Sequence, residues 1–228
     1  MRAERGAGLF VTGTDTGVGK TVVACAIADA LRRRHIDLGV MKPIETGVGP
    51  QGPLDAIALA EAARVRDSLD LICPERFALP AAPSVAAAHE GRLVDRARVL
   101  TAWDALRRLH PLMVVEGAGG LLVPIAPGYS MAELAGDIGL PLLIVARAAL
   151  GTINHTLLTL EAAERRHLVV AGVVISHGPR AISTSDAANL VALRELLGAQ
   201  LRGEIPPLPP EASVPRAAID LDGLLASA

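Results

Sequence analysis

The chain has 228 residues, of which 51% are hydrophobic and only 2% aromatic, and its formal net charge is −2. This length fits one domain, residues 1–228, with an aliphatic core, and the near-neutral charge excludes a general attraction to nucleic acid or to an acidic membrane surface. The longest apolar stretch, residues 138–151, is interrupted by Pro141 and Arg147 and is too short to span a bilayer. Residues 1–8 do not resemble a signal peptide, and the two cysteines match no metal or redox spacing. We therefore expect a cytoplasmic protein.

The predicted elements alternate between short apolar runs and longer segments with helical periodicity. Strands are predicted over residues 8–12, 37–42, 112–115, 121–125, 141–146 and 169–175, with a short edge strand beginning at 203. Helices are predicted over residues 20–34, 55–66 with Asp55 as a candidate N-cap, 84–90, 94–109, 130–138, 153–166, 184–197 and 217–226. A Pro- and Ala-rich loop is predicted over 72–83. This alternation predicts an α/β fold, in which helices cover both faces of a mostly parallel central sheet.

The first predicted strand leads into a glycine-rich turn that ends in Gly19-Lys20-Thr21 and opens a helix. In a phosphate-binding loop of this kind, backbone N–H groups and the positive end of the following helix surround a polyphosphate. Lys20 can reach the β- and γ-phosphates, and the Thr21 hydroxyl can ligate Mg²⁺. The strict motif has a glycine at position 14, whereas this chain has Gly13 and Thr14 and so a loop longer by one residue. The turn predicts a nucleoside triphosphate as ligand.

Two further strand ends carry polar side chains at the edge where such sheets bind ligands. Lys42 precedes a proline that keeps it extended, and its ammonium can stabilise a transferring phosphoryl group. Thr46 can either bind a substrate or close a turn. Glu116 directly follows four apolar residues, where a carboxylate needs a partner. Mg²⁺ shared with Thr21 would supply one, and a structural salt bridge is the alternative.

A glycine also precedes the helix predicted over residues 153–166. The free N–H groups of a helix start suit a carboxylate or a phosphate. A simple cap by Thr152 or Asn154 is the alternative reading of this segment.

Together these segments resemble the dethiobiotin synthetase family. The resemblance is carried, in that family's order and spacing, by Gly13–Thr21, Lys42–Gly47, Val115–Gly120 and Leu150–His155, and Gly203–Pro206 also fits. It covers about residues 8–211 and implies a P-loop NTPase-like fold. It also implies an ATP- and Mg²⁺-dependent ligase of biotin biosynthesis that closes the ureido ring of dethiobiotin from 7,8-diaminopelargonate and CO₂. One amine captures CO₂ as a carbamate, the γ-phosphate activates that carbamate as a mixed anhydride, and the second amine displaces phosphate.

The resemblance assigns roles residue by residue. It makes Lys20 and Thr16 contacts of the phosphates, and it gives Lys42 the carbamate and the transferred phosphoryl group. The implied Mg²⁺ ligands are Thr21, Asp55 and Glu116. The implied nucleotide-binding residues are Gly17, Val18, Gly19, Lys20, Thr21, Val22, Asp55, Glu116, Gly117, Ala118, Gly119, Ser176, His177, Pro206, Pro207 and Leu208.

The resemblance also implies how the second substrate is held. Thr46 would contact it. Its distant carboxylate would be bound by the helix start of the partner subunit, at Gly151, Thr152, Ile153 and Asn154. A homodimer is therefore implied.

Two positions depart from the family's pattern. Relatives often carry asparagine and then aspartate after the strand that ends here at Ile175, and the asparagine reads adenine, whereas this chain has Ser176-His177. The loss of an amide that both donates and accepts predicts a relaxed base preference with triphosphate binding retained. Relatives also commonly carry histidine where this chain has Ser84.

The competing class is a nucleotide-switched ATPase of the partitioning type, which shares the fold but lacks ligase activity. Those proteins usually carry a second lysine five positions before the one at Lys20, and this chain has Asp15 there.

Overall fold

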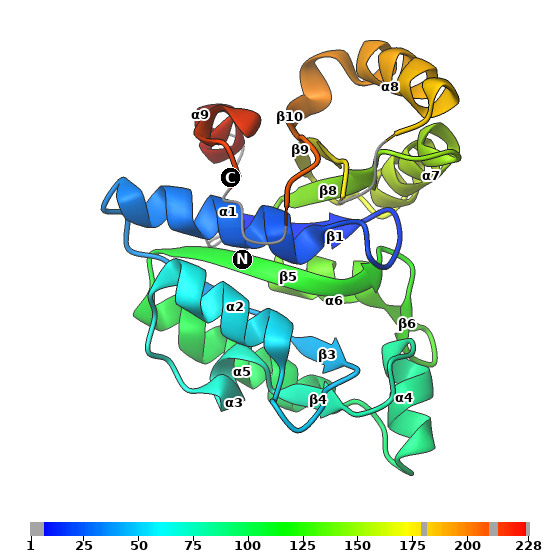
Figure 1. The fold of residues 1–228 in the computed structure, drawn as a ribbon. Helices are drawn as coiled ribbons and strands as arrows, with labels where there is room; N and C mark the ends of the chain where they lie inside the picture. Colours follow the sequence, from blue (N-terminus) through cyan, green and yellow to red (C-terminus); the bar gives the residue numbers. More distant parts are fainter. Residues whose placement is uncertain (1–6, 179–181, 210–213, 227–228) are drawn as a thin grey trace.

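One parallel sheet organises the structure, a computed structural model that describes residues 7–178, 182–209 and 214–226 (Figure 1). Within these residues the sheet has six strands in the order β10-β9-β8-β1-β5-β2. Their bounds are β1 Ala7–Gly13, β2 Gly39–Met41, β5 Leu112–Gly120, β8 Leu142–Arg147, β9 Val170–Ser176 and β10 Leu201–Ile205. The predicted α/β fold is confirmed, and β10 is the edge strand predicted from the prolines that follow it.

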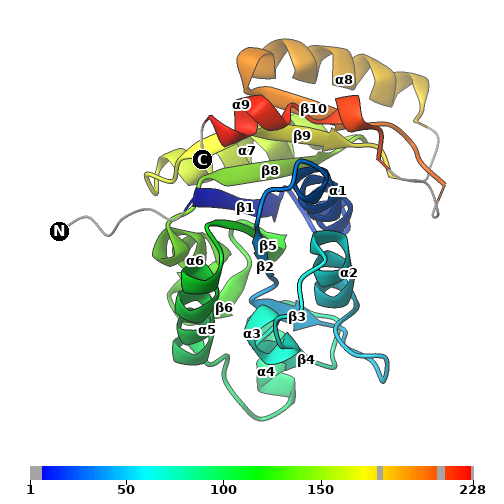
Figure 2. The ribbon, with the colours of Figure 1, turned by 90° about the vertical axis from the view of Figure 1, so that its left-hand side faces the viewer.

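The strands are apolar on both sides because helices cover both faces. On one face, Leu9 and Val11 of β1 pack toward α1 (Lys20–Arg33), α2 (Leu54–Ala63) and α9 (Leu221–Leu225). On the other face, Phe10 packs toward α5 (Arg96–Leu109) and α6 (Met131–Ile138). On the same face as α5 and α6, α7 (Thr152–Glu164) and α8 (Thr184–Leu197) cover the part of the sheet formed by β8 and β9. Figure 2 shows α1 and α2 on the opposite side of β5 from α5 and α6.

Several short elements were not predicted. The loop expected at 72–83 contains β4 (Glu75–Phe77), which pairs in parallel with β3 (Ile44–Thr46). It follows α3 (Leu69–Ile72), which was also not predicted, and it precedes α4 (Pro83–His89), which matches the short helix expected over 84–90. The strand expected at 121–125 lies instead at β6 (Pro124–Ala126), in an antiparallel pair with β7 (Tyr129–Ser130). A short 3₁₀ turn, Gly198–Gln200, directly precedes β10. A second one, Arg216–Ala218, stands at the start of the helix expected at 217–226. Three-residue strands carry no local period, so only their tertiary pairing identifies them.

The start of α2 differs from the prediction. Pro53 occupies the N-cap position, so Asp55 lies inside the first turn and is not the cap. The carboxylate of Glu45, from β3, accepts the N–H groups of Asp55 and Ala56 at 3.1 and 3.0 Å. A side chain distant in sequence thus performs the capping, which leaves the Asp55 carboxylate free to point elsewhere.

The parallel arrangement brings the carboxyl ends of all six strands to one edge of the sheet. The loop 14–19 after β1, the residues after β2, the last third of β5 and the ends of β8, β9 and β10 all meet there. Among the described residues, no helix combines the length and the apolar character needed to cross a bilayer.

Candidate active site

The loop between β1 and α1 is shaped by glycines. Gly17 and Gly19 adopt left-handed backbone conformations, with φ of 70° and 97°, which side chains disfavour. Gly19 is the N-cap of α1 and has no side chain to satisfy the first N–H groups of the helix. A Cβ at Gly19 would lie 2.5 Å from the Ser176 hydroxyl oxygen, so the end of β9 also requires glycine there. The first turn of α1 therefore presents free N–H groups beside β9, as a phosphate site requires.

The Lys20 side chain lies over this loop. Its ammonium donates to the backbone oxygen of Asp15 at 3.1 Å, and the residue is only 7% exposed. Burial lowers the pKa of Lys20 to about 8, and the nearby charge of Lys42 acts in the same direction. An anion bound at the loop would favour the charged form and so raise this pKa again.

Side chains from four separate elements meet beside the loop. The Lys42 ammonium, just after β2, donates to Asp55 of α2 at 2.8 Å and to Glu116 of β5 at 2.6 Å. The Thr21 hydroxyl of α1 donates to the same Glu116 oxygen at 2.8 Å. The structure thus brings together the predicted metal ligands and the predicted catalytic lysine. β5 continues through Gly120, so Glu116 lies within the strand next to Val11 rather than at its end.

The charge of Lys42 is fixed by its neighbours. Burial alone would lower its pKa, but the carboxylates of Glu116 and Asp55 outweigh that effect and raise it to about 12. In this arrangement the two carboxylates hold Lys42 in its charged form. Its backbone N–H also donates to the carbonyl oxygen of Ile72, the last residue of α3, at 2.7 Å. This bond fixes the Lys42 backbone at the end of α3.

One atom of this cluster has no protein partner. Glu116 is fully buried, and its Oε2 has no hydrogen bond to any described residue, whereas Oε1 accepts two. An unpaired buried carboxylate oxygen is costly, and a cation would satisfy it. Among the described residues, no three or more His, Cys, Asp or Glu side chains are grouped so that they could hold a metal ion by themselves. Two carboxylates and a hydroxyl suit Mg²⁺, which takes few protein ligands and keeps oxygens from phosphate and water.

The glycines at the end of β5 lie against the phosphate-binding loop. Gly119 has a φ of 67°, and a Cβ there would approach the Thr16 hydroxyl at 3.5 Å. Gly117 is enclosed by Phe10 and Met131, and Ala118 is buried. Of the predicted residues of this segment, Gly119 therefore lies beside the loop, whereas Gly117 and Ala118 pack against the core.

A cavity of about 720 Å³ continues from the loop across the ends of β8, β9 and β10. It is lined by eight residues predicted to bind nucleotide, namely Gly17, Val18, Gly19, Val22, Ser176, His177, Pro206 and Leu208. Pro207 lines an adjoining cavity of about 390 Å³ instead. The prediction missed Arg147, Ala148, Ala149, Gly178, Ile182, Asp186, Ile205 and Pro209, which also line the larger cavity. Arg147 ends β8, so the strand-end rule that found Glu116 would have found it as well.

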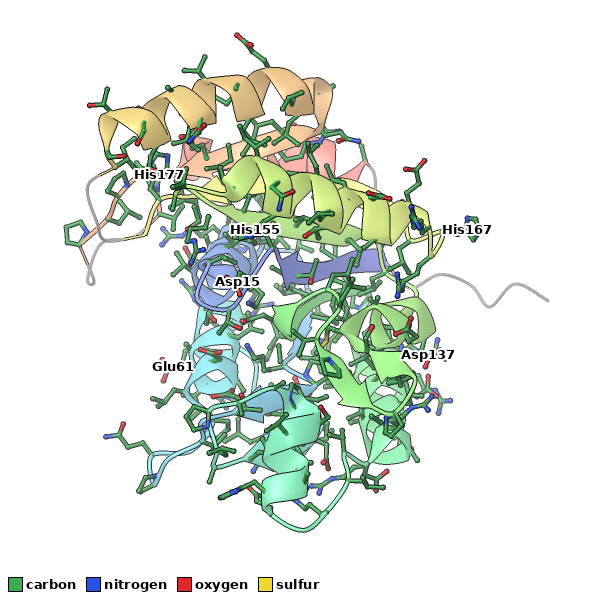
Figure 3. All side chains as sticks on the ribbon, turned by 90° about the vertical axis from the view of Figure 1, so that its right-hand side faces the viewer. Asp15, Glu61, Asp137, His155, His167 and His177 are labelled. Carbon is green, nitrogen blue, oxygen red and sulfur yellow. The ribbon has the colours of Figure 1, made fainter. Side chains whose placement is uncertain are left out.

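His177 contacts Glu204, and Glu204 in turn pairs with Arg194. Its Nε2 lies 2.5 Å from a Glu204 oxygen, and Arg194 of α8 donates two hydrogen bonds to the same carboxylate at 2.7 and 2.8 Å. The hydrogen bonds from Arg194 are the main reason that the pKa of Glu204 lies below its usual value. In Figure 3, Asp15 and His155, which line the same small cavity, lie near the middle of the view, with His177 above and to their left. Neither Arg194 nor Glu204 was predicted as part of the site.

The predicted substrate contacts lie in two places. Thr46 is the half-buried last residue of β3. Gly151 is the N-cap of α7 with a φ of 89°, so the alternative of a Thr152 or Asn154 cap is wrong. Thr152 is buried and its hydroxyl has no partner among the described residues, whereas Ile153 is half-buried and Asn154 exposed. In the described part of the chain, no hydrogen bond or ion pair joins this helix start to the Lys42 cluster.

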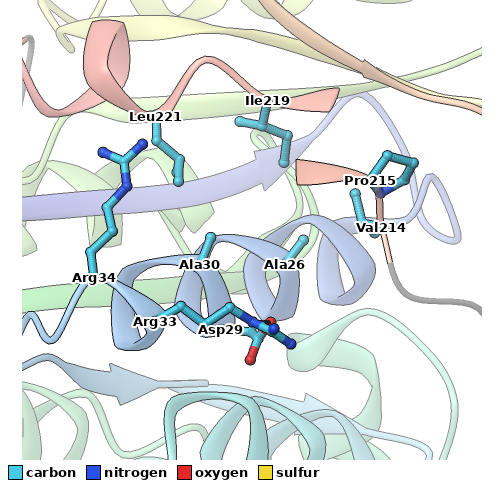
Figure 4. A pocket seen from close by; sticks show the side chains of 9 residues that line it. All are labelled: Ala26, Asp29, Ala30, Arg33, Arg34, Val214, Pro215, Ile219 and Leu221. Carbon is cyan, nitrogen blue, oxygen red and sulfur yellow. Dashed lines mark hydrogen bonds and ion pairs between the residues drawn. The ribbon is translucent and has the colours of Figure 1, made fainter. Parts of the chain in front are cut away.

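A separate cavity of about 670 Å³ lies on the outer face of α1, under the C-terminal segment (Figure 4). Ala26, Ala30 and Ile219 form much of its wall, and Arg33 pairs with Asp29 at its rim. It contains none of the predicted site residues, so the strand-end cavity remains the candidate site.

This combination of a parallel sheet, a glycine loop with a buried lysine, and a carboxylate–hydroxyl pair beside it defines a P-loop nucleotide-binding protein. Residues 7–213 match the model of a family described as an AAA domain. A ParA family ATPase from Chlorobium tepidum has a similar structure, with a TM-score of 0.52 and 15% identity over 97% of this chain and 90% of that one. At that identity the likeness shows the fold alone.

The more similar relatives share one name. The ATP-dependent dethiobiotin synthetase BioD of Anaeromyxobacter dehalogenans is 48% identical over 96% of both chains. Its namesake from Bacillus subtilis is 38% identical over 88% of this chain and 87% of that one. The chain belongs to the dethiobiotin synthetase family. It is an ATP-dependent ligase of biotin biosynthesis.

Proposed function

We propose that this chain closes the ureido ring of dethiobiotin from 7,8-diaminopelargonate, CO₂ and ATP, with Mg²⁺ as cofactor. The observation that carries the proposal is the convergence of Lys42, Asp55, Glu116 and Thr21 beside the phosphate-binding loop. A simple nucleotide switch does not need a second buried lysine between two carboxylates at this place. A reaction in which a carbamate and a phosphoryl group meet does need one.

The loop side of the site would hold the triphosphate. Lys20 and the free N–H groups of α1 would contact its phosphates, with Thr16 beside them at the end of β5. Thr21, Asp55 and Glu116 would hold Mg²⁺, and the unpartnered Glu116 oxygen supports this assignment. When bound, Mg²⁺ would neutralise charge on the β- and γ-phosphates and orient them.

Lys42 would orient the reacting groups. Its ammonium would pair with the carbamate formed from one amine and CO₂, and it would stabilise charge on the γ-phosphoryl group during transfer. The carbamate oxygen then becomes bonded to phosphorus, and ADP leaves. The second amine attacks the carbamate carbon of this mixed anhydride, which closes the ring and releases phosphate.

The far end of the substrate would be bound between two copies of the chain. The free N–H groups after Gly151 suit a carboxylate. Exposed apolar side chains surround this helix start, among them Leu150 at 75% exposure, Leu158 and Leu122. Leu122 and Leu158 line a cavity of about 360 Å³ together with Asp15 of the loop. An apolar surface beside the site supports a homodimer in which the partner completes substrate binding.

The direct test incubates the protein with diaminopelargonate, ¹⁴C-bicarbonate, Mg²⁺ and each nucleoside triphosphate in turn. We expect label in dethiobiotin and stoichiometric release of phosphate. A Lys42→Ala protein that still binds nucleotide serves as the matched control. Label absent from dethiobiotin with every triphosphate, from a protein that binds nucleotide, would refute the proposal.

A further inference from the structure

The Lys42 ammonium lies between the two carboxylates that are assigned to the metal. It donates to Asp55 at 2.8 Å and to Glu116 at 2.6 Å. The Lys42 side chain is 4% exposed and that of Glu116 is 1% exposed. These contacts are built into the fold, because Glu116 lies in central β5 and Glu45 fixes the first turn of α2 at Asp55. Without any bound ligand, the Lys42 ammonium thus already pairs with both carboxylates.

An ammonium and a divalent cation compete for the same oxygens. Both are attracted by carboxylates, and two cations that share one carboxylate oxygen in a buried site repel each other strongly. Glu116 Oε1 already accepts hydrogen bonds from Lys42 and Thr21, whereas Asp55 offers its carboxylate from a more exposed position. A metal that uses Thr21, Asp55 and Glu116 together therefore meets Lys42 at the centre of its site.

We propose that Lys42 is an internal counter-ion of this site, and that a divalent cation binds to the Asp55–Glu116 pair by displacing the Lys42 ammonium. The inference rests on the proposed function, which identifies the metal ligands. It adds that metal binding comes before Lys42 can contact the substrate. Lys42 becomes free for the carbamate and the phosphoryl group only once metal has taken its place. The lysine thus lowers the affinity for metal in the absence of nucleotide, and metal binding makes the lysine available.

The ion pairs of the cluster support this order. Before any ligand arrives, Asp55 and Glu116 both pair with Lys42, whereas Lys20 donates to the backbone oxygen of Asp15. A flexible lysine stem allows the ammonium to move while its backbone stays fixed. The backbone N–H of Lys42 keeps its bond to Ile72 during such a movement.

The test measures metal binding without nucleotide or diamine, so its result does not depend on the ligase reaction. Mn²⁺ is titrated into the wild-type protein, Lys42→Met and Lys20→Met, and free Mn²⁺ is followed by electron paramagnetic resonance. Lys20→Met removes the same charge from the same cluster, but Lys20 donates to Asp15 and to neither carboxylate. We expect Lys42→Met to bind Mn²⁺ at least about tenfold more tightly than wild type, and Lys20→Met to change the affinity much less, because only Lys42 shares ligands with the metal. Mg²⁺ is also expected to raise the melting temperature of Lys42→Met more than that of wild type.

Three outcomes would overturn the proposal. Equal gains in the two variants would show that only net charge matters. Unchanged affinity in Lys42→Met would show that metal binds at Glu116 Oε2 with the lysine still in place. Failure of every protein to bind Mn²⁺ would show that Lys42 is not what excludes the metal. If Lys42→Met does not fold, ¹⁵N-lysine NMR of the wild-type protein decides, because Mg²⁺ must shift the Lys42 ammonium resonance if the lysine is displaced.

Discussion

Replacing Glu45 by alanine should loosen the first turn of α2, and with it the position of Asp55. The Glu45 carboxylate accepts two N–H groups of that turn at 3.1 and 3.0 Å, and Glu45 itself is only 7% exposed. Pro53 at the N-cap has no side-chain acceptor to take over. The variant therefore leaves two backbone donors near the site without their partner.

The size of the effect follows from these two hydrogen bonds. A hydrogen bond to a charged group contributes roughly 1.5–3 kcal/mol, and loss of a helix cap typically costs ~1 kcal/mol. Water can reach the partly exposed Asp55 turn and replace some of the loss. We expect Glu45→Ala to lower the free energy of unfolding by about 2–3 kcal/mol, and Glu45→Gln, which keeps one acceptor oxygen, to lower it by about 1 kcal/mol. For a chain of this size the alanine variant should melt about 4–10 °C lower.

The assay is urea unfolding followed by circular dichroism at a fixed protein concentration. Glu61→Ala is the matched control, because Glu61 lies exposed on the same helix (Figure 3) and should change stability by less than about 0.5 kcal/mol. The affinity for Mg²⁺ should also fall in Glu45→Ala, since Asp55 lies in the loosened turn. An unfolding free energy of Glu45→Ala no lower than that of Glu61→Ala would refute the reasoning.

Three further predictions follow from the site and its surroundings. Lys42→Ala should keep nucleotide affinity within a few-fold but lose about 10²–10³ in turnover, and near wild-type turnover would remove Lys42 from the mechanism. Competition binding of ATP against CTP and GTP should show little selectivity, because Ser176 stands where the resemblance implies an adenine-reading asparagine, and a strong preference for ATP would contradict this. The pKa of Glu133 is lowered from 4.5 to about 2, chiefly by the hydrogen bond from the Ser130 hydroxyl. The stabilisation it gives should therefore be full above pH 4.5 and disappear as the pH falls toward 2. The unfolding free energies of wild type and Glu133→Gln should converge over that range, and a constant difference would show that this carboxylate does not contribute through its charge.

Local sequence pattern predicted the elements that are long and apolar. β1 and α1 follow from a continuous apolar run, a glycine turn and helical spacing, all within 30 residues of each other. Glu116 was found because a carboxylate after four apolar residues is unusual in any environment. These features depend on neighbours in sequence, and the structure places them together as predicted.

The parts that were missed depend on residues distant in sequence. β3 and β4 are identified only by pairing with each other, and the α2 cap comes from Glu45 on another strand. Asp55 looked like a cap because Pro53 and Leu54 give no sign that a carboxylate from β3 will fill that position. The network that holds His177 joins Arg194 and Glu204 across α8 and β10. None of these contacts has a periodicity or a motif that a single sequence could show.

The two halves of the site come from different parts of the chain. The proposed phosphate and metal ligands lie in or next to β1, α1, β2, α2 and β5, whereas the rest of the large cavity is lined by residues of β8, β9 and the segment after β10. If the nucleoside binds in this cavity as proposed, substitutions in the later segments would alter which nucleoside is accepted while the phosphoryl-transfer residues stay intact. With this division, the preferred nucleoside triphosphate could change by successive substitutions, in evolution or by design. Each intermediate variant would still close the ring.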